Sequence, residues 1–194
     1  MNKQQTISKP VSLKGVGIHS GNEVNLTFKP ANEDFGYAFC RTDLPGKPII
    51  EADVNYVVST ERGTTLEKNG VNIQTSEHVL AALTGLEIDN VLIEIDASEP
   101  PIMDGSSKFF VEALINAGIE EQSKDRNEYV VKEIISYHDE ESGSDITVLP
   151  SDSYEVTAMV DFGTKILGTQ NATMKNLSEF KDNFSNARTF SFLH

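Results

Sequence analysis

The sequence predicts an α+β fold with an internal repeat, on three observations. Before residue 75, apolar and polar residues alternate with period two between glycine-containing turns, which is typical of strands. Residues 75–85 and 106–117 instead place their apolar residues at helical spacing. After residue 128, strand patterns resume and a short helix follows at about 178–186. The second half therefore begins as the first does, and we interpret it as an incomplete second copy.

The strands of the first half begin with a hairpin. Val24, Leu26 and Phe28 alternate with polar residues after a run at 11–18 that is broken by Gly15 and Gly17. The alternating pattern continues through residues 37–40, 49–58, 64–66 and 71–73. Asn69-Gly70 predicts a tight turn before the last of these strands.

Two helices follow, separated by one strand. Thr75 or Ser76 is suited to cap the first helix, and Gly85 to end it. Residues 91–95 have apolar side chains on both faces, as a central strand would. The second helix, residues 106–117, carries one apolar stripe and is closed by Gly118.

These elements predict a domain division. We expect a first α+β domain over residues 1–122, a linker over 123–128, and the beginning of a second α+β domain over 129–194, truncated at its end. The linker is placed there because residues 120–128 are uniformly polar. Strands are expected at 129–135, 146–149 and 154–160.

Composition and charge disfavour nucleic-acid binding and predict the cellular compartment. The 194 residues include 30 acidic and 16 basic side chains, giving a net charge of −14. Such a charge disfavours binding to nucleic acid, which depends on Lys and Arg at the phosphates. The single cysteine, Cys40, allows no intrachain disulfide and favours a reducing compartment. With no secretory signal or transmembrane segment in the sequence, we expect a soluble, cytoplasmic protein.

Glu77 and His78 are the first candidates for chemistry. Adjacent helical residues point about 100° apart, but at a first turn that lines a cleft their side chains can converge. The imidazole would then bind zinc, and the carboxylate would accept a proton from a metal-bound water. Taken alone, the pair is better explained by an ordinary hydrogen-bonded histidine, since position 82 is alanine rather than the second histidine of the usual helical zinc motif.

Other candidates also have structural explanations. Asp104 or Ser106 can cap the second helix, and His19 lies in a glycine-rich hairpin turn. Thr189 follows a predicted helix, where it is either a cleft hydroxyl or a plain loop threonine. His138 lies among acidic residues, which is typical of a solvated loop.

Six ordered blocks of the sequence resemble one family over the whole chain. They are Gly-Val-Gly-Ile-His-Ser-Gly at 15–21, Arg-Thr-Asp-Leu at 41–44, Thr-Ser-Glu-His at 75–78, Gly-Leu-Glu-Ile-Asp-Asn at 85–90, Pro-Ile-Met-Asp-Gly-Ser at 101–106 and Ala-Arg-Thr-Phe at 187–190. The family is the UDP-3-O-acyl-N-acetylglucosamine deacetylases, zinc enzymes of lipid A (lipopolysaccharide) biosynthesis in Gram-negative bacteria. The resemblance implies two α+β domains, each a sheet layered against helices, with the active site between them.

The resemblance also implies roles for individual residues. His78 corresponds to a Zn²⁺ ligand, Glu77 to the general base, and Thr189 to the hydroxyl that stabilises the oxyanion. The expected substrate contacts are Phe190 near the sugar and acyl group, Asp161 and Phe162 near the nucleotide, and His19. Gly163 stands where the family often continues with His-Pro after the aromatic residue.

The resemblance places the remaining zinc ligands and the general acid beyond residue 194. The chain by itself is therefore expected to be inactive, whereas its parent hydrolyses UDP-3-O-acyl-N-acetylglucosamine. Two alternatives stay open: a non-enzymatic binding or interaction module on the same scaffold, and an unrelated metal-dependent hydrolase. The latter would need a second ligand, and the other histidines stand in no ligand spacing with His78.

Overall fold

The computed structural model describes residues 2–189, and the chain divides into two compact units. The first unit combines the residues up to Arg126 with the segment from Phe180 onward, and the second is Asn127–Glu179. The segment from Phe180 was expected in the second domain. It joins the first unit because the Phe180 ring packs directly on Gly85 and against the core.

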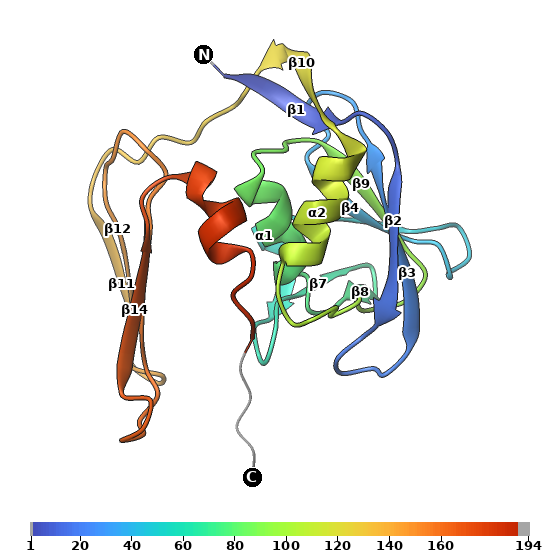
Figure 1. Ribbon diagram of the computed structural model, residues 1–194. Coiled ribbons are helices and arrows are strands. Elements are labelled where there is room, and N and C mark those ends of the chain that lie inside the picture. Colours follow the sequence, from blue (N-terminus) through green and yellow to red (C-terminus); the bar gives the residue numbers. More distant parts are fainter. Residues whose placement is uncertain (1, 190–194) are drawn as a thin grey trace. The chain divides into compact units, whose positions relative to one another are not determined.

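A five-stranded sheet with two helices against it forms the body of the first unit (Figure 1). The strands, in spatial order, are β2 (Val11–Val16), β3 (Glu23–Pro30), β9 (Val91–Ile95), β4 (Tyr37–Arg41) and β5 (Ile49–Glu51). β9 is central, antiparallel to β3 and parallel to β4. The helices α1 (Glu77–Gly85) and α2 (Lys108–Ala117) contact each other and share the sheet's core. The predicted α+β class, the two helices predicted in the first half and the predicted central strand are confirmed.

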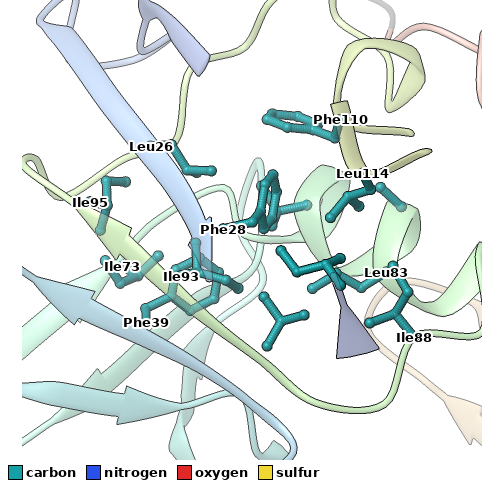
Figure 2. Close-up of a cluster of buried hydrophobic side chains, with 14 of the residues drawn as sticks. Leu26, Phe28, Phe39, Ile73, Leu83, Ile88, Ile93, Ile95, Phe110 and Leu114 are labelled. Atoms are coloured by element: carbon teal, nitrogen blue, oxygen red, sulfur yellow. The ribbon is translucent and has the colours of Figure 1, made fainter. Parts of the chain in front are cut away.

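The core lies between this sheet and the helices. Figure 2 shows Leu26 and Phe28 of β3 facing Leu83 of α1 and Phe110 and Leu114 of α2. All five side chains are fully buried. The rings of Phe28 and Phe110 meet edge to face, with centroids 6.3 Å apart and an interplanar angle of 84°, a favoured aromatic geometry. The alternation of apolar and polar residues along β3 therefore places Leu26 and Phe28 on the face of the sheet that packs against the helices.

A smaller antiparallel sheet precedes α1. It consists of β6 (Val57–Ser59), β7 (Thr65–Lys68) and β8 (Val71–Ile73), and a 3₁₀ turn (Val54–Tyr56) leads into it. The predicted Asn-Gly turn joins β7 to β8, with φ of 53° at Asn69 and 76° at Gly70. Positive φ at both positions is the reason that Asn-Gly is favoured in such hairpins.

Two strands of the first unit were not expected. β1 (Lys3–Ile7) pairs antiparallel with β10 (Ile119–Asp125), so residues 123–125 are part of a strand and not of the linker. Asn90 secures this pair, because its amide donates to the side chains of Gln4 and Gln122. The polar sequence of β10 is explained by its exposure: of its side chains only Gln122 is half-buried.

The second unit contains two hairpins. β11 (Ile135–Asp139) pairs with β12 (Ser144–Val148), and β13 (Val156–Asp161) pairs with β14 (Thr169–Met174). The strand expected at 129–135 starts only at Ile135, and β14 was not predicted. Where a helix was expected at 178–186, the structure has a 3₁₀ turn (Leu177–Glu179) and, in the first unit, a π turn (Phe180–Phe184). The internal repeat stays a prediction.

Replacing Gly85 by alanine tests the contact that returns the chain to the first unit. A Cβ at Gly85 would overlap the Phe180 ring, so we expect a loss of about 1–3 kcal/mol in unfolding free energy, as for other overpacked sites. In a Phe180→Ala background the same change has no ring to displace and should leave the unfolding free energy unchanged. Urea unfolding of the unmutated protein, the two single variants and the double variant measures the coupling between the two residues. An equal loss of unfolding free energy in both backgrounds would contradict the packing of the Phe180 ring on Gly85.

Tyr37 makes the stability of the first unit depend on pH in the alkaline range. Burial raises the pKa of Tyr37 to about 12, and its hydroxyl donates to the Ile88 carbonyl. The unfolded chain releases this proton near pH 10. The contribution to stability is therefore complete below about pH 10 and falls as the pH rises towards about 12. Urea unfolding across this range should show the decline, and Tyr37→Phe should remove it.

Candidate active site

Glu77 begins α1, and its carboxylate is oriented by the backbone of Thr64. The Thr64 amide donates to Glu77 Oε2 at 2.8 Å. The Thr64 carbonyl accepts from the Ser76 amide at 3.2 Å and from the Ser76 hydroxyl at 3.0 Å. Ser76 holds the N-cap position, but its hydroxyl makes this bond and does not cap the helix. Glu77 Oε1 would lie 3.3 Å from a Cβ on Gly63, so the carboxylate lies against the turn that precedes β7.

His78 lies on the same turn of α1, and its backbone is tied to the start of α2. The Ser107 hydroxyl donates to the His78 carbonyl at 3.0 Å. The side chains of Glu77 and His78 are both half-buried, whereas the next residue, Val79, is fully buried in the core. The pair therefore stands at the edge of the core, which is where a residue that must meet a ligand is expected.

The loop of residues 103–107 connects His78 to Thr189. While Ser107 bonds His78, the Gly105 carbonyl accepts from the Thr189 amide at 2.8 Å. Gly105 has φ of 87°, and a Cβ there would meet the Thr189 methyl at 3.6 Å. Thr189 itself is exposed. The structure thus brings Thr189 and the turn of Glu77 and His78 to one loop, although Thr189 is more than a hundred residues from that turn in the sequence.

Asp104 serves the structure of this loop. Its Oδ1 accepts from the Ser106 hydroxyl at 2.6 Å and from the Ser106 amide at 3.1 Å. These bonds, the hydroxyl bond first, hold the pKa of Asp104 below its usual value. The Ser106 hydroxyl also accepts from the Lys108 amide at 3.2 Å, which satisfies a free donor at the start of α2. The N-cap position itself belongs to Ser107, so the prediction of Asp104 or Ser106 as the N-cap is wrong, although the Ser106 hydroxyl accepts this amide hydrogen.

His19 rims a cavity next to Glu77. The cavity has a volume of about 230 Å³ and is lined by residues from the turns around it: His19, Glu61, Arg62, Gly63, Thr65, Gln74 and Thr75. Gly63 is the residue that packs on the Glu77 carboxylate, so His19 and Glu77 approach the same part of the first unit. The role of His19 in binding substrate stays a prediction.

The predicted nucleotide contacts lie at the end of β13 in the second unit. Asp161 Oδ1 accepts from the Gly163 amide at 2.9 Å, and the Phe162 amide donates to the Gly168 carbonyl at 3.1 Å. Both bonds belong to the turn between β13 and β14. Phe190, the other predicted aromatic contact, lies outside the described residues.

The described residues do not form a complete zinc site. Within residues 2–189, no group of three His, Cys, Asp or Glu side chains comes together in a way that could hold a metal ion. Catalytic zinc takes three protein ligands. His78 can supply one of them, and the described part of the chain does not fit the metal by itself.

Sequence reasoning missed two residues that organise this region, Glu99 and Ser107. Glu99 precedes two prolines in a loop, a position that gives no sign of a buried carboxylate, yet its side chain is fully buried. Ser107 stands at the N-cap position of α2 but bonds α1 instead. Neither contact has a local signal in the sequence, because both partners come from distant segments.

The comparison with known families decides the identification. Residues 4–194 match the family described as LpxC, UDP-3-O-acyl N-acetylglycosamine deacetylase. The chain belongs to the LpxC family. The resemblance inferred from the six sequence blocks is confirmed.

Individual LpxC relatives are longer than this chain. It is 47% identical to the bifunctional enzyme LpxC/FabZ of Chlorobaculum tepidum, over 98% of this chain and 41% of the relative. It is 43% identical to the UDP-3-O-acyl-N-acetylglucosamine deacetylase of Geotalea uraniireducens, over 98% of this chain and 62% of the relative. The chain therefore spans less than two thirds of either protein. Among the described residues, no helix is long and apolar enough to cross a membrane.

Proposed function

We propose that the full-length protein is a zinc-dependent deacetylase that removes acetate from UDP-3-O-acyl-N-acetylglucosamine during lipid A biosynthesis. One observation carries the proposal. Glu77, oriented by Thr64, and His78 share the first turn of α1, and the 103–107 loop links that turn to Thr189. The LpxC relatives that bear the deacetylase name support the choice of substrate. The single cysteine favours a reducing, cytoplasmic compartment for this reaction.

Glu77 is proposed as the general base. Its Oε2 accepts the Thr64 amide hydrogen, and Oε1, which takes no hydrogen bond from the described residues, is proposed to accept a proton from the attacking water. Positioned bases of this kind contribute about 10²–10⁴-fold to rate. Zinc, when bound, supplies a Lewis acid for the poorly electrophilic amide.

Thr189 is proposed to donate its hydroxyl to the oxyanion that forms as the acetyl carbonyl is attacked. The bond from its amide to Gly105 ties its backbone to the 103–107 loop, and the exposed hydroxyl is proposed to reach the oxyanion from there. Loss of one such donor typically costs about 10²–10³-fold in rate. The departing amine must also gain a proton, and we propose that this acid lies outside residues 1–194.

Metal removal tests the zinc proposal. A chelator should abolish acetate release by the full-length protein, and added Zn²⁺ should restore it. His78→Ala should lower the zinc content of the full-length protein, whereas His138→Ala should leave it unchanged because His138 lies in the β11–β12 hairpin and pairs with Asp145. Full activity after complete chelation would rule out a zinc enzyme.

The 194-residue chain alone is expected to bind zinc weakly and to be inactive, because we propose that two zinc ligands lie outside it. Elemental analysis of the purified chain, combined with an acetate-release assay, measures both properties. Stoichiometric zinc together with deacetylation by this chain would contradict the proposed division of ligands. Zinc-independent ligand binding without hydrolysis by the full-length protein would instead favour the binding-module alternative.

A further inference from the structure

Glu99 is a buried carboxylate that the proposed chemistry does not use. Its side chain has 0% exposure. Oε1 accepts from the His19 amide at 3.0 Å and from the Thr75 hydroxyl at 3.3 Å. Oε2 accepts from the Ser20 amide at 2.8 Å and from the His19 amide at 3.2 Å. One carboxylate thus holds two turns that are far apart in the sequence.

The charge of Glu99 is stabilised by these donors. Among the described residues, no Lys or Arg forms an ion pair with it. Burial acts to raise the pKa of Glu99, but hydrogen bonds from the His19 and Ser20 amides, together with the Ser20 side chain and the charge of His19, hold the pKa below its usual value. A buried charge is costly unless it is fully hydrogen-bonded. The charge of Glu99 is therefore stable only while its hydrogen-bond donors, the His19 and Ser20 amides and the Thr75 hydroxyl, keep their positions.

The surrounding backbone is shaped around this carboxylate. A Cβ at Gly17 would overlap Glu99 Oε2 and the Ser20 hydroxyl. A Cβ at Gly15 would lie 2.8 Å from the Pro101 Cβ. The two glycines of the Gly-Val-Gly segment are therefore required by close approach to the loop that carries Glu99.

Thr75 connects Glu99 to the proposed base. Thr75 is buried and has φ of 52°, a conformation that costs free energy for a β-branched residue and persists only when its surroundings enforce it. The next two residues are Ser76 and Glu77, which bond the Thr64 backbone. Thr75 and His19 also line the same cavity.

We propose that Glu99 is a positioning residue of the deacetylase site, whose buried carboxylate joins the turn of His19 to the turn of Thr75 and thereby fixes the placement of Glu77. The proposal rests on the proposed function for its catalytic consequence. Its structural content, the coupling between Glu99 and Glu77, is independent of activity.

Glu99→Gln tests the proposal in the full-length protein. The amide keeps the size of the side chain but turns a donor towards one of the two backbone amides. We expect kcat to fall by about 10–100-fold, because small displacements of catalytic groups have effects of this order. Glu94→Gln is the matched control: Glu94 lies on β9 and pairs with Lys29 near the surface, so its loss should leave kcat unchanged.

Amide hydrogen exchange supplies a readout that needs no activity. In Glu99→Gln the amides of His19 and Ser20 should exchange faster, and so should the Thr64 amide, which reports on Glu77. Unchanged exchange at Thr64, or wild-type kcat and KM in Glu99→Gln, would overturn the proposal. If the unmutated protein releases no acetate, the proposed function fails, while exchange at Thr64 still decides whether Glu99 positions Glu77.

Discussion

Replacing Glu77 by glutamine is expected to lower kcat for acetate release by about 10²–10⁴-fold, the contribution of a positioned general base. Glutamine retains a side-chain oxygen that can accept the Thr64 amide hydrogen at the place of Oε2. The fold and the bond to Thr64 should therefore survive, and only the basicity is lost. Steady-state kinetics of the full-length protein measure the effect.

Two companion variants sharpen this test. Glu77→Ala removes the bond to Thr64 as well, so it should also lower the unfolding free energy by about 0.5–1.5 kcal/mol, as for a lost hydrogen bond. Glu112→Gln removes a carboxylate from the surface of α2, where Glu112 pairs with Lys108, and should leave kcat unchanged. Wild-type turnover in Glu77→Gln would remove Glu77 from the mechanism.

Phe28→Ala should produce the largest loss of stability in the first unit, about 3–5 kcal/mol. Phe28 is fully buried at the centre of the core, and its removal also breaks the edge-to-face contact with Phe110. The neighbouring helices cannot close the cavity without leaving their contacts with the sheet. Chemical denaturation followed by circular dichroism measures the change.

Phe35→Ala is the control for this truncation. Phe35 has 40% exposure and lies outside the core, so the same chemical change should cost about 1 kcal/mol or less. A similar loss in both variants would contradict the assignment of the core between the sheet and the two helices.

The sequence predicts the core elements well because their signal is local. The alternation of Leu26 and Phe28 and the apolar run of β9 specify buried strands without reference to the rest of the chain. β1 and β10 give no such signal. Their polar residues are held by partners such as Asn90, and that pairing appears only once the chain has folded.

The same distinction applies to the site. Glu77, His78 and Thr189 were proposed from motifs, and the structure brings their segments to one loop through Ser107 and Gly105. Their chemical roles remain predictions. Glu99 could not be found from the sequence, because an acidic residue before two prolines is typical of a solvated turn. Its burial depends on the approach of the Gly17 backbone.

The central claim is that His78 and Glu77 face one metal site at the first turn of α1. Anomalous scattering from crystals of the full-length protein, recorded at the zinc absorption edge, tests it most directly. We predict a peak at about 2.0–2.1 Å from an imidazole nitrogen of His78, on the side of α1 to which the Glu77 carboxylate points. A zinc peak remote from His78, or on the opposite side of α1 from Glu77, would contradict the account.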